Sequence, residues 1–262
     1  MVRQCHQEDE RINVDDPFEP AQVKIAVIGG GTGSFTLLSS LKDHSSQIAA
    51  LVNMADDGGS TGVLRDELGA LPPGDIRQCL VALSETPKLR ELFNYRFEEG
   101  SLKGHAFGNL FLTALEKMTG NFAEGVELAS ELLNITGIVE PITLTSVTLA
   151  MKSESGDVTK GEYQIASADF HGEKPDFWLE PKADANPTAI AAITQADMVI
   201  IEPGNLYGSL ALELVVPGGA KPIEKYRTVK VCVCKLGTKR GQTERVDCWD
   251  MDEHNEGTAR RP

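Results

Sequence analysis

The chain has 262 residues, of which 41% are hydrophobic and 24% are charged, an ordinary composition for a globular protein. Its formal net charge of -14 argues against nucleic-acid and anionic-membrane partners, because neutralising phosphates requires clusters of Lys and Arg. No apolar run approaches the ~18 residues that a membrane-spanning helix needs. Five scattered cysteines fit a reducing compartment better than a disulfide framework. We therefore expect a cytoplasmic protein, and the sequence leaves open whether it is a homo-oligomer.

The N-terminal part of the chain predicts a leader, then a strand and a helix. Residues 1–20 are polar and acid-rich, which is typical of a flexible leader. Residues 23–28 are apolar and rich in β-branched side chains, as in a strand that is buried on both faces of a parallel sheet. Glycines follow, and then Phe35, Leu38 and Leu41 recur at helical spacing.

The next part predicts a second strand and several helices. Residues 48–53 form another short apolar run. A helix is expected to begin at Asp75, a good N-cap residue, because Ile76, Leu80 and Leu83 make one apolar face behind it. Further helices are expected at about residues 88–97, 105–118 and 122–133.

An antiparallel hairpin is predicted in the middle of the chain. Residues 142–166 are rich in Thr and Val, alternate in polarity and carry Ser-Gly-Asp near their centre. We interpret a segment of about residues 138–182 as an excursion from a single α/β domain that spans residues 21–240.

The last core elements follow this excursion. Asn186 and Pro187 open a helix in the favoured N-cap and N1 order. Residues 198–201 and 229–234 predict two buried strands. Residues 241–262 lose helical periodicity, and we expect them to be irregular.

Unusual residues follow three of the predicted strands. They are "GGGTGS" after the first strand, "ADDGGSTG" after the second and "EPGNLYGS" after residues 198–201. Parallel α/β sheets bind ligands outside the carboxyl ends of their strands, where loops lead into helices. We therefore expect the three loops to share one ligand.

The first of these loops predicts a phosphate site. Gly29, Gly31 and Gly33 let backbone N–H groups approach a ligand, and the helix that follows adds a positive dipole end. The spacing from Gly29 to Ser34 nearly fits the dinucleotide fingerprint, with Asp56 about where a ribose contact is expected. A tight turn without a ligand is the alternative.

The second loop predicts a cation beside the phosphate. Asp56 and Asp57 would repel a phosphate unless a cation lay between them, and Mg²⁺ usually takes one or two carboxylates, phosphate oxygens and waters. A nicotinamide cofactor needs only one carboxylate for its ribose, so it leaves the second aspartate unexplained. A solvated turn is the structural alternative.

Four further polar residues are secondary candidates. Arg77 lies just inside its helix and could reach an anion, although a surface position is equally compatible with the sequence. Asn109 follows a glycine, which allows a backbone or a ligand to come close. His105 favours capping or packing over catalysis, and Arg65 carries no more specific signal.

The motifs, taken together, resemble the CofD/YvcK family. That family contains the bacterial gluconeogenesis factors and, more distantly, the phospholactate transferase that makes a deazaflavin coenzyme. The resemblance covers residues 23 to about 240 and favours the gluconeogenesis-factor branch. It is carried by "GGGTGSFTLLSSLK", "ADDGGSTGVLRDELGALPPGDIRQCLVALS", "LFNYRFEEG", "GHAFGNLFLTAL" and "PGNLYGSL".

The resemblance implies a Rossmann-like fold, with a doubly wound, mostly parallel sheet that binds a nucleotide. In the gluconeogenesis factors it implies a uridine-diphosphate sugar and a role in carbon metabolism and cell shape. In the transferases it implies a divalent metal and attack of an alcohol on a nucleoside-diphosphate linkage. By motif, the site would be lined by Gly30, Gly31, Thr32, Gly33, Asp56, Asp57, Asn109, Gly204, Asn205 and Leu206.

The chain departs from the family pattern in two places. The third loop has Glu202, Asn205 and Gly208 where the family usually has Gly, Ser and Thr. Glu202 adds a carboxylate near the proposed phosphate site. After about residue 240 the chain also looks truncated or altered relative to the family.

These observations predict a regulatory protein that binds a nucleoside-diphosphate sugar together with Mg²⁺. The first alternative is a metal-dependent transferase that acts on a nucleoside-diphosphate substrate, although no catalytic residue can be assigned from the sequence. A nicotinamide-dependent oxidoreductase is the weaker alternative, because of the doubly acidic second loop.

Overall fold

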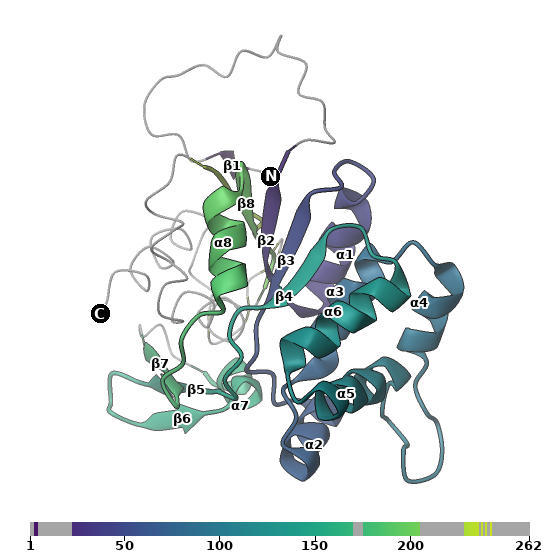
Figure 1. The fold of residues 1–262 in the computed structure, drawn as a ribbon. Helices are drawn as coiled ribbons and strands as arrows, with labels where there is room; N and C mark the ends of the chain where they lie inside the picture. The colour runs from purple at the N-terminus through teal and green to yellow at the C-terminus, as the bar shows by residue number, and fades with distance from the viewer. Residues whose placement is uncertain are drawn as a thin grey trace.

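The computed structural model describes residues 3–4, 23–169, 175–204, 228–235, 237, 239 and 242 (Figure 1). Most of the predicted leader and of residues 241–262 lies outside these ranges, as do Asn205 and Leu206. Residues 3 and 4 form a short strand that pairs with the main sheet.

A parallel sheet of five strands forms the centre of the protein, in the order β9, β8, β2, β3, β4. The strands are β2 (Ile25–Gly29), β3 (Ile48–Val52), β4 (Ile138–Pro141), β8 (Met198–Ile201) and β9 (Val229–Cys232). Antiparallel β1 (Arg3–Gln4) extends this sheet beside β9. The first strand in the parallel set, β2, lies at its middle, with later strands on both sides. This order is that of a doubly wound, Rossmann-like fold, as predicted.

The connecting helices agree with the predicted positions in most cases. They are α1 (Gly31–Leu41), α2 (Gly59–Leu68), α3 (Pro73–Leu83), α4 (Pro87–Asn94), α5 (Phe107–Thr119), α6 (Phe122–Leu133), α7 (Glu162–Ser167) and α8 (Pro187–Gln195). Asn186 caps α8 as expected, because its side chain accepts a hydrogen bond from the Thr188 N–H.

Two details differ from the sequence prediction. The second of the three loops, "ADDGGSTG" after β3, is shorter than expected because α2 already begins at Gly59. We refer to it as the second acidic loop. Asp75 is not the N-cap of α3; the helix begins at Pro73, since the fixed ring of proline is preorganised for the first helical position. Asp75 therefore lies in the first turn, and its side chain is available for other contacts.

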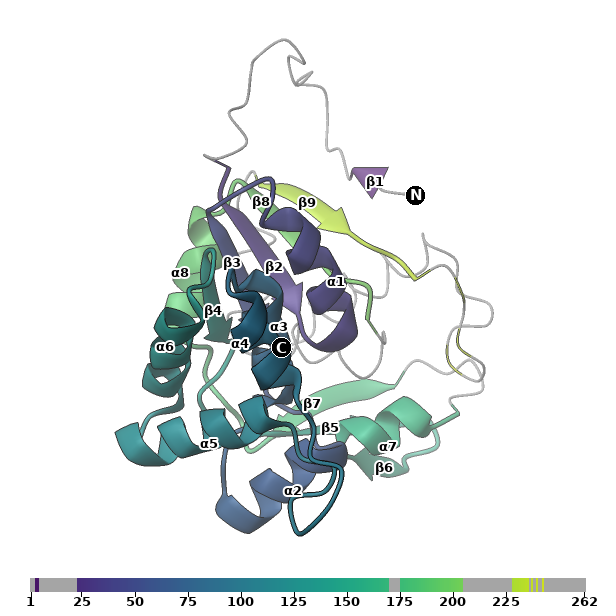
Figure 2. The same ribbon diagram turned by 90° about the vertical axis from the view of Figure 1, so that its right-hand side faces the viewer.

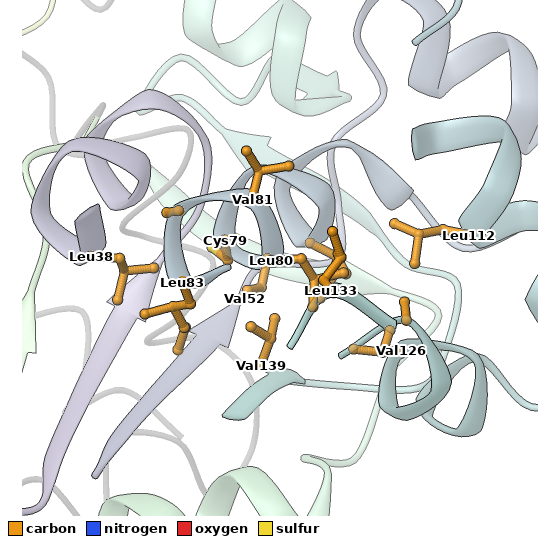
Figure 3. Close-up of a cluster of buried hydrophobic side chains, with 14 of the residues drawn as sticks. Leu38, Val52, Cys79, Leu80, Val81, Leu83, Leu112, Val126, Leu133 and Val139 are labelled. Carbon is orange, nitrogen blue, oxygen red and sulfur yellow. The ribbon is translucent and has the colours of Figure 1, made fainter. Parts of the chain in front are cut away.

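Helices cover both faces of the sheet, and the alternation of side chains along each strand explains why. Ile25 and Val27 of β2 belong to the large cluster beneath α1, α3 and α6, whereas Ala26 and Ile28 belong to the cluster beneath α8. Figure 2 shows α1 and α3 on one side of the strands and α8 on the other. In Figure 3, side chains from α3 meet those of β3, β4 and α6 in the large cluster.

The predicted hairpin is present and gains a third strand. β5 (Thr148–Lys152) pairs with β6 (Val158–Lys160) and with β7 (Asp176–Glu180), all antiparallel. The excursion begins later than residue 138, because β4 pairs with β3 in the main sheet. The small sheet and α7 lie beyond the carboxyl ends of the central strands in both views (Figures 1 and 2).

The small sheet has its own apolar core, which is anchored to the main sheet. Leu149, Ile165 and Leu179 are buried in it together with Ala55, which lies three residues beyond the end of β3. This packing holds α7 over the second acidic loop. In the part of the chain that the structure describes, no helix is both long and apolar enough to cross a membrane.

Candidate functional site

The carboxyl ends of β2 and β8 form the switch point of the sheet. β3 and β4 lie on one side of β2, and β8 and β9 lie on the other. Ligands of open α/β sheets bind in the crevice where the strand order reverses in this way. The glycine loop after β2 meets Glu202, the residue that follows β8, at this point. The structure thus brings the first and third predicted loops together.

The two loops approach so closely that side chains would not fit between them. A Cβ atom added to Gly33 would lie 2.6 Å from the Pro203 carbonyl oxygen, and one on Gly29 would overlap the Glu202 carboxyl group. Gly31 has a φ of 74°, a left-handed backbone conformation that residues other than glycine rarely adopt. The glycines therefore serve close packing at the start of α1.

Glu202 places its carboxylate at the start of α1. Its Oε1 accepts a hydrogen bond from the Gly30 N–H at 2.5 Å, and its Oε2 accepts one from the Ser34 hydroxyl. The residue is 1% exposed. Burial raises the pKa of Glu202 to about 7, against the opposing effect of these two hydrogen bonds. A carboxyl group thus occupies the end of α1 at which the helix dipole favours negative charge.

Asp75 borders the same loop from the other side. A Cβ atom on Gly30 would clash with its Oδ2, and one on Gly31 would lie 3.4 Å from its Oδ1. Burial raises the pKa of Asp75 well above its usual range, and the carboxylates of Asp56, Glu162 and Glu202 raise it further. The glycine loop therefore lies between two acidic side chains, the buried Glu202 and the half-buried Asp75.

The adjacent carboxylates of the second loop point to different partners. Asp56 Oδ1 accepts the Gly58 N–H at 2.9 Å, and its Oδ2 lies 3.3 Å from the position of a Cβ on Gly74 in α3. Burial, above all, raises the pKa of Asp56. Asp57 Oδ1 instead accepts the Tyr163 N–H at 3.0 Å, in the first turn of α7. Asp57 thus links the second loop to the small sheet.

The donor set around Asp56 is compatible with a cation that completes its shell with ligand and water oxygens. Mg²⁺ usually takes only one or two protein carboxylates. Among the residues that the structure describes, no three His, Cys, Asp or Glu side chains are grouped as a ready-made metal centre. The raised pKa values of Asp56 and Asp75 reflect buried negative charge that a bound cation would stabilise.

Arg77 and Asn109 are brought together, but inside the protein. Arg77 Nε donates to Asn109 Oδ1 at 2.9 Å, and its Nη1 donates to Asn94 Oδ1. Arg77 is 8% exposed and Asn109 is 2% exposed. Gly108 permits this approach, because a Cβ there would lie 2.8 Å from Arg77 Cδ. The pair therefore ties α3, α4 and α5 together.

The remaining predicted residues take various places. Thr32 is exposed in the first turn of α1, and Gly204 lies two residues beyond Glu202. Arg65 donates from Nη2 to the Val147 carbonyl oxygen at 2.7 Å, so it supports the small sheet. The carbonyl of His105 accepts the Phe97 N–H at 3.0 Å just before α5.

The acidic side chains around the glycine loop and the second loop were only partly predicted from the sequence. Asp75 was expected to cap a helix, and Glu162 carried no signal because the hairpin gave no hint that α7 would fold over the second loop. Glu202 was visible as a departure from the family pattern, although its hydrogen bonds depend on how β8 ends beside the glycine loop.

The fold and these loops define a Rossmann-like α/β protein with an acidic, glycine-lined switch point. The chain belongs to the CofD family: residues 25–257 match the family described as 2-phospho-L-lactate transferase CofD. The family resemblance that was predicted from the motifs is thus confirmed.

Relatives and a solved structure agree with this assignment. The chain is 42% identical over 224 residues to the gluconeogenesis factor of Bacillus subtilis, with 84% of this chain and 70% of that protein aligned. It is 45% identical over 225 residues to a protein of Thermoanaerobacterium thermosulfurigenes, with 84% and 69% aligned. A crystal structure from Bacillus halodurans, described as a member of the UPF0052 family, is 40% identical with a TM-score of 0.84. The alignment covers 91% of this chain and 77% of that one.

Proposed function

We propose that this protein binds a nucleoside-diphosphate sugar, of the uridine type, at the switch point between β2 and β8. Its role would be that of a gluconeogenesis-factor-type regulator, linked to carbon metabolism and cell shape, in the cytoplasm. The gluconeogenesis factor name of the Bacillus subtilis relative supports the first part of this role. The diphosphate would lie over residues 30–33, beside Gly204, which follows Glu202 and Pro203 at the end of β8.

The observation that carries the proposal is the Glu202 carboxyl group, which accepts two hydrogen bonds within the glycine loop. Gly30 and Ser34 donate hydrogen bonds to the carboxylate of Glu202 at the start of an eleven-residue helix. Donors that hold a carboxylate in this way have the geometry and polarity to hold a phosphate oxygen.

We further propose that Mg²⁺ accompanies the nucleotide, held by Asp56 and Asp57 together with phosphate oxygens and waters. When bound, the ion would offset the repulsion between the phosphates and the acidic loop. The chain's own residues would orient the ligand, because Asp57 anchors the loop to α7 while Asp56 faces α3.

A panel of nucleotides in a thermal-shift and calorimetric assay tests the proposal. At a ligand concentration of 100 times Kd, binding should add about 2.7 kcal/mol of stability and raise the melting temperature by several degrees. We expect a uridine-diphosphate sugar to do this and NAD or NADP to fail. Gly30→Ala should abolish the shift, because its Cβ would meet Asp75. Gly237→Ala is a suitable control, because a Cβ there meets no atom of the described residues within 4 Å.

The metal is tested in the same assay by titrating the nucleotide with and without Mg²⁺. Reciprocal coupling of about 1–3 kcal/mol is expected, since each ligand improves the binding of the other. Asp56→Asn, and separately Asp57→Asn, should reduce this coupling and leave the fold intact, because Asn keeps an acceptor for Gly58 or Tyr163. If neither variant alters the response to Mg²⁺, these carboxylates do not hold the metal.

A transferase is the second candidate, because the matching family is described by that activity. Attack of an alcohol on the diphosphate would form a phosphodiester and release a nucleoside monophosphate. Release of the monophosphate only when Mg²⁺ and an alcohol acceptor are both present would favour the enzyme, whereas binding without turnover favours the regulator.

A further inference from the structure

Glu202 occupies the place that a ligand phosphate would take. Its Oε1 accepts a hydrogen bond from the Gly30 backbone N–H and its Oε2 accepts one from the Ser34 hydroxyl, both at the start of α1. A second anion cannot use these donors while the carboxylate accepts from both. The protein thus carries its own carboxyl group at the proposed phosphate position.

The loop is shaped around this carboxylate. Gly29 leaves room for it, because a Cβ there would overlap the carboxyl group, and a Cβ on Gly33 would lie 3.5 Å from its Cδ and Oε2. The residue is 1% exposed, and it follows β8 directly, so the strand fixes where the side chain starts. Glu202 therefore fills a fitted slot and is not a surface side chain that rests there by chance.

Neighbouring carboxyl groups make a negative charge on Glu202 energetically unfavourable at this position. Asp75 faces the loop from α3, and Asp56 and Glu162 raise the pKa of Asp75 as Glu202 does. Arg77 acts in the opposite direction, although its Nε and Nη1 atoms are engaged with Asn109 and Asn94. A nucleotide would bring further negative charge to this region, so the position of Glu202 matters for any anionic ligand.

We propose that Glu202 sets the ligand affinity of this site as an internal competitor, whose carboxylate must leave Gly30 and Ser34 before a diphosphate can bind to them. This inference rests on the proposed function, because it assigns the diphosphate to the same donors. It makes Glu202 the residue through which this chain holds its ligand weakly and exchanges it readily.

The experiment compares the binding of UDP-glucose and of pyrophosphate to the full chain and to three variants by calorimetry. Glu202→Gly empties the slot, and Glu202→Gln keeps its shape but replaces a charged acceptor with a weaker neutral one. Glu140→Gln is the matched control, because Glu140 is also a strand-borne carboxylate whose pKa burial raises, and it bonds Asn186 away from the loop. Melting curves without ligand confirm that each variant is folded.

We expect both ligands to bind Glu202→Gly at least about tenfold more tightly than the unchanged chain, with Glu202→Gln between them and Glu140→Gln unchanged. If UDP-glucose binds the Glu202 variants as tightly as the unchanged chain, or more weakly, Glu202 is not a competitor, although the protein still binds a nucleotide. If pyrophosphate binds the Glu202 variants more tightly but UDP-glucose binds none of the proteins, Glu202 competes with phosphate as proposed and the proposed function is wrong. If neither ligand binds any variant, both proposals fail.

Discussion

At the scale of single residues, the buried carboxyl of Glu202 links stability to pH. Burial raises its pKa from the ordinary 4.5 to about 7, so the folded state binds a proton that the unfolded chain has already lost over this interval. Stability therefore falls as the pH rises from about 4.5 to 7, and the loss is complete above pH 7.

Glu202→Gln should remove this contribution. At pH 8 we expect the variant to be more stable than the unchanged chain by up to about 3 kcal/mol, because each unit of pKa shift is worth about 1.4 kcal/mol. Urea unfolding at a series of pH values measures it, with the exposed Glu98→Gln as a control. Asp56 shifts in the same direction and remains in both proteins, so its contribution cancels. The difference reports on Glu202 together with the part of the Asp75 shift that Glu202 causes. Parallel stability curves for the two proteins would refute the assignment.

At the scale of secondary-structure elements, the buried Arg77 organises the helices beside the site. It hydrogen-bonds Asn109 of α5 and Asn94 at the end of α4 from its own place in α3. Burial lowers the pKa of Arg77, because it removes the charged guanidinium from water, and the nearby charge of Arg96 lowers it further. Through these hydrogen bonds the pair fixes how α3, α4 and α5 pack against one another.

Asn109→Ala should therefore destabilise the fold by about 1–3 kcal/mol, because it leaves a buried Nε–H of Arg77 without its acceptor. Chemical denaturation measures this loss. Asn121→Ala, which removes only the exposed cap of α6, should cost about 1 kcal/mol and serves as the comparison. A large loss of nucleotide affinity in a still-folded Asn109→Ala protein would instead place Asn109 in the binding site.

At the scale of the whole molecule, the small sheet is coupled to the main sheet through the second acidic loop. Asp57 accepts a hydrogen bond from Tyr163 of α7, and Ala55 is buried in the core of the small sheet. The glycine loop is coupled to β8 through Glu202. At the proposed site, a ligand would therefore contact segments that belong to three distant parts of the chain.

Hydrogen exchange should show this coupling. We expect nucleotide with Mg²⁺ to slow amide exchange together in residues 30–34, 56–62 and 161–165, because ordering the second loop also stabilises the first turn of α7. The exposed turn at residues 153–157, which closes the β5–β6 hairpin, should not respond. Protection confined to the glycine loop would show that the small sheet is independent of ligand binding.

Much of the fold follows from local patterns that the sequence displays. The buried strands near residues 25, 48 and 198 are continuous apolar runs, and the helix capped by Asn186 begins where its cap and proline predict. These signals lie in adjacent residues, so they can be recognised without knowing which other segments pack against them. The start of the excursion was placed too early, because nothing in the sequence near residue 138 shows that β4 pairs with β3.

The candidate site divides in the same way. The sequence by itself determined the family, the glycine loop after the first strand and the acidic loop after the second, because these are contiguous motifs. Only the tertiary structure decided where their side chains point: Asp57 toward α7, Arg77 toward Asn109, and Glu202 into the glycine loop. These partners are separated by 106, 32 and 172 positions along the chain. Packing of the strands and helices, which no local pattern encodes, brings them together.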